Sequence, residues 1–216
     1  MRILAIETSG PTFSLALAEN SKVVSEIFWH SGLKHSEQLV PSLRKLLKRA
    51  GWKVSSIDKV AVSTGPGSFT GIRVGLSCAK TIAQALKVPL AAFNSIDILK
   101  SSMPEKGNRV FGVIDALRNE VFVKDRSGKV VIKNSQEYWE ELKHLKSRVN
   151  LIGSAVITHK NEIRNILGKY AIITTSDNNY PKAGVLALMA DKMPGKNYKT
   201  IEPLYVRRSW AEERRH

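Results

Sequence analysis

The sequence predicts an α/β protein made of two copies of one βββαβαβα lobe. First, short apolar runs of strand-like length alternate with longer amphipathic stretches of helical period. Second, this pattern restarts, since Glu7 and Asp115 lie 108 positions apart and Lys22 and Lys129 lie 107 apart. Third, 216 residues with 43% hydrophobic side chains suffice for one to two domains with a buried core.

The first copy opens with three apolar runs that are separated by turn residues, which predicts a meander of three strands. A helix follows, because leucines then recur at helical spacing until Gly51. The expected elements are strands at 2–8, 13–18 and 22–29, a helix at 34–50, a strand at 59–64, a glycine-rich loop at 65–71, a helix at 72–86 and a strand at 88–93.

The second copy repeats this order without detectable residue identity. Its expected elements are strands at 109–115, 120–125 and 129–133, a helix at 136–146, a strand at 149–153, a helix at 158–167 and a strand at 170–174, followed by a helix at 181–193 and a tail at 196–216. We expect an N-terminal lobe at 1–102 and a C-terminal lobe at 103–216, with the tail packing back on the first lobe.

The charge balance leaves two interpretations of the surface open. The chain has 34 Lys and Arg against 19 Asp and Glu, so its formal net charge is +15. Either these cations bind a phosphate-rich ligand such as RNA, or they form a solvated surface. They are spread along the chain and do not alternate with aromatic residues, as they would on an RNA-stacking platform.

Membrane, secretory and disulfide-built classes are excluded by simple counts. The longest apolar runs fall far short of the ~20 residues that span a bilayer, and the N-terminus meets Glu7 without a signal-peptide pattern. The single cysteine, Cys78, excludes an intrachain disulfide framework and a zinc site built from cysteines. Inside an expected helix it fits a buried, unreactive side chain. We expect a cytoplasmic protein without membrane contact.

The densest motif is a glycine-rich loop, GPGSFTGIRVG at 65–75, between an expected strand and an expected helix. Backbone N–H groups at such a junction favour anions. However, no Gly-Lys-Ser/Thr follows at the phosphate-loop spacing, and Thr70 stands where a dinucleotide fingerprint needs its third glycine. Gly71 and Gly75 permit close helix packing. An anion-binding loop and a purely structural turn both remain open.

The duplicated layout resembles the actin-like ATPase and sugar-kinase superfamily, whose paired lobes have ribonuclease-H-like folds. In such folds an acidic residue closes the first strand of each lobe, and adjoining turns cradle phosphates. Glu7 and Asp115 hold these positions here, although Glu7 could equally cap a strand end. The residues that the resemblance marks for nucleotide or phosphate contact are Glu7, Thr8, Ser9, Gly65, Gly67, Ser68, Thr70, Gly71 and Arg73.

Five motif blocks, in order along the chain, resemble the TsaB family, also called YeaZ. The blocks are IETS at 6–9, HSEQLVP at 35–41, the glycine loop with the following AK at 79–80, VIDALRNEVF at 113–122 and PLYVR at 203–207. The fourth block departs from the family pattern at Leu117, where the family has arginine. The resemblance runs from end to end and is weakest over 136–194.

This resemblance implies a non-catalytic subunit. TsaB proteins resemble the catalytic subunit TsaD and pair with it, alongside the ATPase TsaE. The assembly transfers threonylcarbamoyl to N6 of adenosine 37 in ANN-decoding tRNAs. TsaD-type proteins carry a His-x-x-x-His metal motif, and its two positions are Ser95 and Leu99 here. We therefore expect no catalytic residue, no metal and no tightly bound cofactor, with ATP or ADP only at the boundary with TsaD.

The resemblance also places two helices in contact with TsaD. The candidate interface residues are His35, Leu39, Leu43, Leu46, Ile72, Leu76, Ala79 and Ala83, whose apolar members would serve core and interface together. His35 and Glu37 also fit the chemistry of a helix start. The same face would close a homodimer when TsaD is absent. We expect tRNA to be reached through the complex, and direct contact stays open.

Two other functions remain open on the residues alone. An ATP-dependent small-molecule kinase would fit the duplicated lobe, although the short units leave little room for a subdomain that closes on a substrate. A metallopeptidase of the glycoprotease type fits the former grouping of the family, but His30 and His35 lie five apart and do not share a helix face. Ser68 and Thr70 lack a G-x-S-x-G nucleophile elbow.

Overall fold

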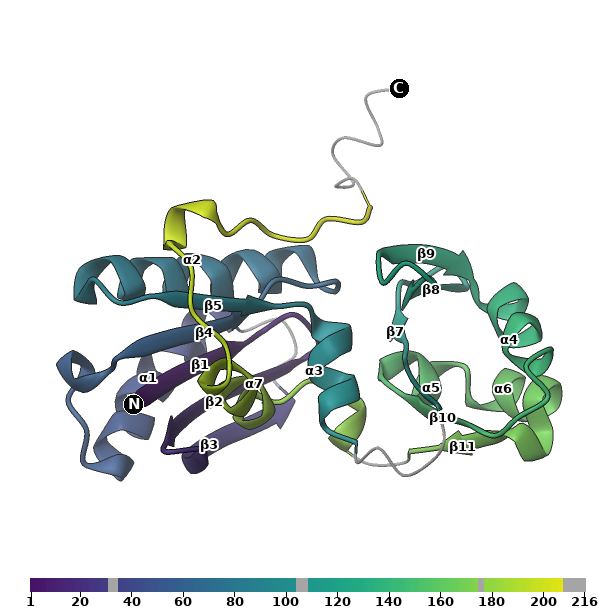
Figure 1. Cartoon of the computed structure of the whole chain (residues 1–216), viewed down its shortest axis with the longest axis horizontal. Helices are drawn as coiled ribbons and strands as arrows, with labels where there is room; N and C mark the ends of the chain where they lie inside the picture. Colours follow the sequence, from purple (N-terminus) through teal and green to yellow (C-terminus); the bar gives the residue numbers. More distant parts are fainter. Residues whose placement is uncertain (31–34, 104–108, 175–176, 208–216) are drawn as a thin grey trace, which may run out of the picture. The chain divides into compact units, whose positions relative to one another are not determined.

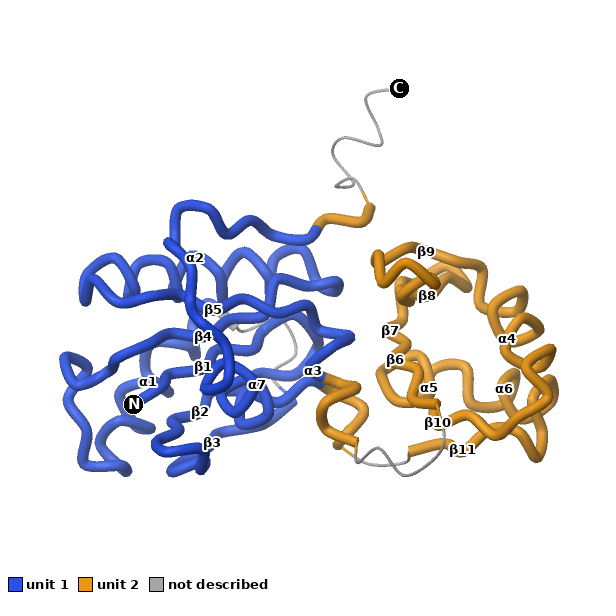
Figure 2. Tube along the Cα trace, in the orientation of Figure 1, with its two compact units in different colours: residues 1–98, 181–204 blue, residues 99–180, 205–216 orange. Residues whose placement is uncertain are grey.

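The computed structural model describes residues 1–30, 35–103, 109–174 and 177–207, apart from the side chain of His35. The chain divides into two compact units (Figure 2): unit 1 consists of residues 1–98 and 181–204, and unit 2 of residues 99–180 and 205–216. Within the described ranges, none of the helices has the length and apolar character needed to cross a membrane.

Unit 1 is built on a five-stranded sheet in the order β3-β2-β1-β4-β5. The strands are β1 (Arg2–Glu7), β2 (Thr12–Glu19), β3 (Lys22–His30), β4 (Lys59–Ser63) and β5 (Leu90–Phe93). β1 pairs antiparallel with β2 and parallel with β4, which makes it the central strand. The helices are α1 (His35–Ala50), α2 (Phe69–Leu86), α3 (Ser95–Ser101), which leads into unit 2, and α7 (Ala183–Asp191). Short 3₁₀ turns lie at Val54–Ser56 and Tyr198–Thr200.

Side-chain alternation along the strands gives this sheet two different faces. Larger residues such as Leu4 and Ile6 pack with α1 and α2 in one buried cluster. Alanines such as Ala5, Ala16 and Ala61 form the opposite face and pack with α7. Because alanine side chains are short, α7 can lie close against the strands, as Figure 1 shows. The pattern along the strands therefore determines which helix covers which face.

The position of α7 corrects the expected second lobe. Residues 181–204 were expected within 103–216, but they belong to unit 1, because α7 fills the alanine-rich face of its sheet. Farther along, Lys196 pairs with Leu90 in an antiparallel bridge. The chain enters unit 2 again at Tyr205. The second lobe is therefore discontinuous in sequence.

A buried lysine holds the end of α7 against the sheet. Lys59 of β4 is 5% exposed, and its Nζ donates to the carbonyl oxygens of Ala190 at 3.0 Å and Met193 at 2.8 Å. The last carbonyl groups of a helix lack partners inside the helix and carry its partial negative charge. A lysine ammonium is therefore well matched to this end of α7.

Unit 2 repeats the strand order of unit 1 with one break. Its sheets have the orders β11-β10-β6 and β7-β8-β9, and the consecutive strands β6 and β7 together take the place of β1. The strands are β6 (Arg109–Gly112), β7 (Ile114–Asp115), β8 (Glu120–Lys124), β9 (Val130–Asn134), β10 (Val149–Ile152) and β11 (Ala171–Ile173). The helices are α4 (Ser135–Lys143), α5 (Ser154–Thr158) and α6 (Lys160–Leu167), with 3₁₀ turns at Gly168–Tyr170 and Asp177–Asn179. The expected duplicated α/β fold is confirmed.

The break in the first strand of unit 2 was not expected. The sequence predicts one strand at 109–115, but the strand is divided at Val113. The Val113 carbonyl accepts a hydrogen bond from the Ala155 N–H at 3.3 Å, and a Cβ on Gly153 would lie 2.0 Å from the same oxygen. The start of α5 therefore takes the Val113 carbonyl away from the sheet.

Several helix boundaries also differ from the predictions, including those of α4, which ends at Lys143, and α7, which spans Ala183–Asp191. The helix expected at 72–86 begins one turn earlier, at Phe69, because the Ser68 hydroxyl accepts from the Gly71 N–H at 3.2 Å and caps it. The helix expected at 158–167 is two helices, α5 and α6, which meet at His159. The short helix α3 was not predicted.

Replacing Lys59 by Met should destabilise unit 1, because the apolar stem is kept while the carbonyl groups of Ala190, in the last turn of α7, and of Met193, just after it, lose a charged donor. A loss of about 1.5–3 kcal/mol in the free energy of unfolding is expected. Urea unfolding of the wild type and of Lys59→Met measures it. The exposed Lys53 gives the matched control, since Lys53→Met should stay within about 0.5 kcal/mol of the wild type. Equal stability of Lys59→Met and the wild type would contradict this role.

Candidate functional site

The central strand of unit 1 ends in a buried acidic side chain. Glu7 is 1% exposed at the end of β1. Its Oε1 accepts hydrogen bonds from the N–H and the hydroxyl of Ser9, each at 2.6 Å. Its Oε2 and the Ser63 hydroxyl are also buried, and neither makes a hydrogen bond of normal geometry with the described residues. Oε1 of Glu7 thus has hydrogen-bond partners among the described residues, and Oε2 has none.

Burial raises the pKa of Glu7 above its ordinary value, and the Ser63 and Ser9 hydroxyls and the Ser9 N–H lower it only in part. A buried carboxylate loses the hydration that stabilises its charge in water. The ionised form of Glu7 therefore costs folding free energy that the protonated form does not.

The glycine-rich loop packs directly on the turn that follows β1. At Gly67, where φ is +152°, an added Cβ would lie 2.0 Å from the Ser9 carbonyl oxygen. The Ser68 N–H donates to that same oxygen at 2.7 Å. The Ser9 and Ser95 hydroxyls lie 2.7 Å apart, and the Ser95 N–H donates to the Gly65 carbonyl at 2.7 Å. We call this arrangement of Glu7, Ser9, the loop and Ser95 the serine junction.

The start of α2 is fastened to β1 in a similar way. The Thr8 hydroxyl donates to the Gly71 carbonyl at 2.7 Å. A Cβ on Gly75, one helical turn further, would lie 2.2 Å from Thr8 Oγ1. Only glycine leaves room for this contact at position 75. The loop is therefore packed closely against the turn after β1, as the interpretation as a structural turn predicts.

The residues marked for phosphate contact fall into two groups. The structure brings most of them together in and around the serine junction, where their polar groups already bond to one another: Glu7, Thr8, Ser9, Gly65, Gly67, Ser68 and Gly71. Thr70 and Arg73 are exposed on the first turns of α2, and the Arg73 guanidinium lies 4.7 Å from the centre of the Phe69 ring. A phosphate could therefore reach the second group without rearrangement of the first.

The interface residues expected on α1 and α2 require a correction. The described side chains are at most 7% exposed and pack inside unit 1: Leu39, Leu43, Leu46, Ile72, Leu76, Ala79 and Ala83. A side chain that the core covers has no surface to give to a partner. The side chain of His35 lies outside the described residues. The large apolar side chains that stay exposed on these helices include Val40 of α1, at 51%, and Phe69 of α2, at 37%.

The two positions that carry the metal pair in TsaD-type proteins have packing roles here. Ser95 is 0% exposed and bonds within the serine junction, and Leu99 is also 0% exposed. Among the described residues, no group of three or more His, Cys, Asp and Glu side chains is arranged to hold a metal ion.

Cys78 lies half-buried within α2. Burial raises the pKa of its thiol to about 11. A thiol that stays protonated at neutral pH is a poor nucleophile and a poor metal ligand. The structure thus favours the unreactive role expected from the sequence.

In unit 2, Asp115 closes β7 at the place that Glu7 holds in unit 1. Its Oδ1 accepts from the Leu117 N–H at 2.9 Å and lies 3.7 Å from Nε2 of His159. Arg207 forms an ion pair with Glu120 and donates to the carbonyl of Ala116 at 3.1 Å. Two of the motif blocks therefore meet through Arg207. His159 was not singled out from the sequence, although its spacing of three from Glu162 is typical of a side-chain pair on one helical turn.

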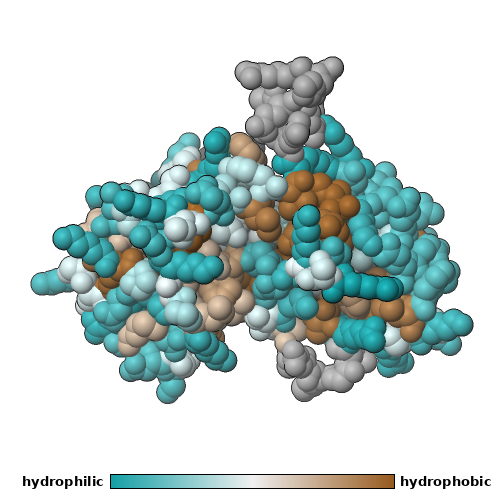
Figure 3. All heavy atoms as spheres, turned by 45° about the horizontal axis from the view of Figure 1, so that its top comes forward, coloured by the Kyte–Doolittle hydropathy of each residue, from teal (hydrophilic) through white to brown (hydrophobic). Residues whose placement is uncertain are grey.

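The basic side chains lie largely in solvent. On α1 the cationic residues Arg44, Lys45, Lys48 and Arg49 are all exposed. On the face drawn in Figure 3, hydrophilic residues predominate and hydrophobic residues form smaller groups. Both interpretations of the +15 charge, a phosphate-rich partner and a solvated surface, fit this arrangement.

Replacing Glu7 by Gln should stabilise unit 1 near neutral pH. Since the folded-state pKa is raised above 4.5, the wild type loses stability as the pH rises above that value, while the variant does not. Thermal unfolding at about pH 4 and about pH 7.5 compares the two proteins across this window. The advantage of Glu7→Gln should be larger at the higher pH. The exposed Glu37 gives the control Glu37→Gln, which should show no such growth. If Glu7→Gln were less stable than the wild type at the higher pH, the raised pKa assigned to Glu7 would be contradicted.

Comparisons with known proteins agree on one family. The family model described as "TsaD: tRNA N6-adenosine threonylcarbamoyltransferase" matches residues 30–146. The tRNA threonylcarbamoyladenosine biosynthesis protein TsaB of Bacillus subtilis is 28% identical over 221 residues, which cover 98% of this chain and 96% of the relative. TsaB of Escherichia coli is 32% identical over 124 residues, or 56% of this chain and 53% of that protein.

Solved structures show the same fold. A Pseudomonas aeruginosa protein described as similar to peptidase YEAZ has a TM-score of 0.78 at 24% identity, covering 95% of this chain and 99% of its own. YeaZ from Pseudomonas aeruginosa has a TM-score of 0.73 at 23% identity, covering 94% and 99%. A ROK hexokinase from Thermus thermophilus, at 9% identity and a TM-score of 0.51 over 89% of this chain and 99% of its own, shares the fold alone. The chain belongs to the TsaB (YeaZ) family, within the group of proteins that the TsaD family model describes.

Proposed function

We propose that this chain is a non-catalytic subunit that supports the transfer of threonylcarbamoyl to N6 of adenosine 37 in ANN-decoding tRNAs. The observation that carries the proposal is the similarity to a tRNA threonylcarbamoyladenosine biosynthesis protein over 98% of this chain and 96% of that relative. The partners of this subunit are a TsaD-type catalytic subunit and a TsaE-type ATPase, and tRNA is reached through the complex.

The serine junction supports a non-catalytic role for unit 1. Ser9, Ser95 and the loop are hydrogen-bonded to one another, so their polar groups are committed to the fold. The Thr8 hydroxyl is likewise committed to α2. A phosphate at this turn would have to compete with these bonds, which weakens the kinase alternative. ATP or ADP is proposed only at the boundary with the TsaD-type subunit.

The exposed side of α1 and α2 supports a protein interface. Val40 and Phe69 are large apolar side chains that remain 51% and 37% exposed. Burial of such side chains against a partner stabilises a complex, at roughly 25 cal/mol per Å² of apolar surface. Arg73, beside Phe69, adds a charge that a carboxylate of the partner can pair with. The same surface would serve a homodimer when the TsaD-type subunit is absent.

A reconstituted reaction tests the subunit role. It contains the TsaD-type and TsaE-type subunits, a source of threonylcarbamoyl-AMP and an unmodified ANN-decoding tRNA transcript. Modified adenosine, measured by mass spectrometry of digested tRNA, should form only when this chain is added. The reaction without the TsaD-type subunit is the control and should give no product. Full modification in the absence of this chain would overturn the proposal.

A charge placed on α1 tests the proposed interface. Val40→Glu should weaken association with the TsaD-type subunit about tenfold or more, because an unpaired carboxylate would be buried in the complex. Val54→Glu is a matched control, since Val54 is 45% exposed and lies in the 3₁₀ turn outside both helices. Analytical ultracentrifugation of the mixtures measures the difference. Equal affinities for the two variants would exclude this face of α1.

A further inference from the structure

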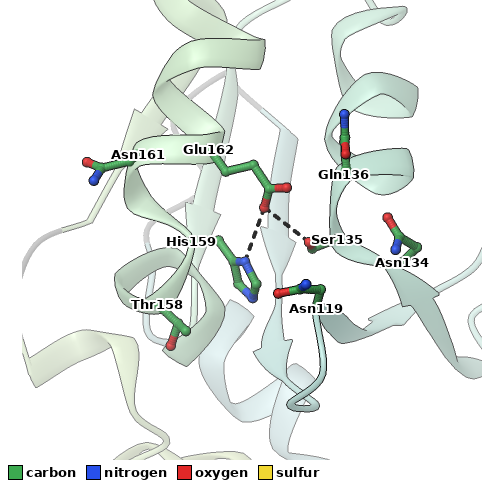
Figure 4. Close-up of a pocket in the computed structure, with 8 residues that line it drawn as sticks. All are labelled: Asn119, Asn134, Ser135, Gln136, Thr158, His159, Asn161 and Glu162. Carbon is green, nitrogen blue, oxygen red and sulfur yellow. Dashed lines mark hydrogen bonds and ion pairs between the residues drawn. The ribbon is translucent and has the colours of Figure 1, made fainter.

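Unit 2 contains a polar pocket of 340 Å³ that the proposed function does not use (Figure 4). It lies where α4 and α6 begin, beside the turn between β7 and β8. The lining residues are Asn119, Asn134, Ser135, Gln136, Thr158, His159, Asn161 and Glu162. Side-chain amides outnumber charged groups in this set. Its chemistry is therefore that of hydrogen bonding rather than of ion pairing.

The floor of the pocket is a fixed hydrogen-bond network. Oε2 of Glu162 accepts from the Trp139 indole N–H at 2.9 Å and from the Ser135 hydroxyl at 3.1 Å, and it lies 3.1 Å from Nδ1 of His159. Trp139 and Ser135 are 0% and 1% exposed. Buried networks of this kind hold their members in one geometry. Ser135, His159 and Glu162 of the lining are thus set in place before any ligand arrives.

His159 has hydrogen-bonding capacity that the described residues leave unused. Its side chain is only 9% exposed, and its Nε2 makes no hydrogen bond among them. The nearest acidic atom, Oδ1 of Asp115, lies 3.7 Å away, beyond hydrogen-bond distance. Figure 4 shows the amide of Asn119 directed toward the His159 ring. A buried polar atom without a partner is unusual, so the hydrogen bonding of the His159 ring is incomplete within the described residues.

Asn119 lies at the pocket in a turn with left-handed backbone, a conformation that few residue types adopt readily. Leu117, Arg118 and Asn119 have φ values of +62°, +55° and +57°. Left-handed backbone costs roughly 1–2 kcal/mol for an ordinary L-residue, and asparagine tolerates it best. The Ser135 N–H donates to the Asn119 carbonyl at 2.8 Å and fixes the turn against α4. The side-chain amide of Asn119 itself makes no hydrogen bond within the described residues, so it is free for a ligand.

Asn134 contributes a second amide. Its Oδ1 accepts from the Glu137 N–H at 3.2 Å and caps α4, so its NH₂ group is the part left for a ligand. An asparagine amide carries a donor and an acceptor side by side. Its natural partners are groups that also present both, as the edges of nucleobases do. An anion fits less well, because the carboxylate of Glu162 is part of the wall and would repel it.

Two cationic residues adjoin lining residues in the sequence. Arg118 adjoins Asn119, and Lys160 lies between the lining residues His159 and Asn161. RNA carries neutral bases joined by negative phosphates, so amides inside a pocket and cations outside it suit an extruded nucleotide. A saccharide or a peptide backbone would use the amides but would gain nothing from the cations.

We propose that this pocket binds an unstacked nucleobase of RNA. The amides of Asn119 and Asn134 meet its hydrogen-bonding edge, and Arg118 and Lys160 lie toward the adjoining phosphates. The proposal rests on the proposed function in taking tRNA as the RNA. It adds a direct contact between this chain and tRNA, to which the fourth motif block contributes Arg118 and Asn119.

Neutral ribonucleosides test the pocket without any phosphate. Adenosine, guanosine, cytidine and uridine are titrated separately into the full chain, and the side-chain NH₂ resonances of Asn119 and Asn134 are followed by NMR. At least one nucleoside should shift both. Asn165, exposed on α6 outside the pocket, should not respond. The proposal would be overturned if none of the four nucleosides shifted the Asn119 and Asn134 resonances. It would also be overturned if glucose or a glycine peptide shifted these resonances and the nucleosides did not.

Charge-matched variants test the contact with RNA. In Asn119→Asp the new residue still tolerates the left-handed turn, and in Asn134→Asp it still caps α4. Each substitution removes one NH₂ donor from the pocket. Each should weaken binding of an unmodified tRNA transcript about five- to hundredfold in fluorescence anisotropy. Asn165→Asp adds the same charge outside the pocket and should change affinity little. Arg118→Gln should lower the salt dependence of binding by about one ion.

The outcomes separate this inference from the proposed function. Equal losses for Asn119→Asp and Asn165→Asp would overturn the pocket contact, whatever the reconstituted reaction shows. If this chain is required for threonylcarbamoyl transfer while nucleosides leave the pocket unmoved, only the pocket inference fails. If nucleosides bind but the chain is dispensable, the proposed function fails and the pocket stands.

Discussion

The close contact between the glycine loop and the turn after β1 is the constraint on which unit 1 depends. The Ser9 carbonyl accepts from the Ser68 N–H at 2.7 Å, and a side chain at Gly67 would overlap it. Ser9 also bonds to Glu7 and lies 2.7 Å from the Ser95 hydroxyl. One residue thus joins the central strand, the start of α2 and the start of α3. Because α2 enters here, its buried face is directed onto the sheet.

The second copy solves the same packing problem with different residues. A Cβ on Gly153 would lie 2.0 Å from the Val113 carbonyl, as a Cβ on Gly67 would from Ser9. In unit 2, however, the contact divides the first strand, and Asp115 stands in a separate short strand. Its carboxylate is 17% exposed, so it faces His159 and solvent, whereas Glu7 is sealed in the interior. Duplication has therefore kept the layout while the chemistry of the two lobes diverged.

Packing within unit 1 decided which side of α1 is buried and which side stays exposed. Leu39, Leu43 and Leu46 recur at helical spacing, and the sequence leaves open whether such a face meets the core or another protein. The leucines of this face are buried within unit 1, and the exposed Val40 lies on the other side of α1, which is the side that we propose for the partner. Packing also explains why α7 belongs to unit 1, because its apolar residues pack against the alanines of β1, β2 and β4.

The sequence by itself determined the duplication, the family and the order of the elements except for α3, the division between β6 and β7 and the division between α5 and α6. Apolar runs, turn residues and motif blocks are local, and local spacing is enough to recognise them. Tertiary structure alone decided three things: that Thr8 and Ser9 bond to the glycine loop, its helix and Ser95, that 181–204 returns to unit 1, and that Ser135 and Trp139 reach Glu162 beside the pocket. Asn119 and His159 are 40 positions apart in the chain, and only the folding of β7, β8 and α6 brings them to one pocket.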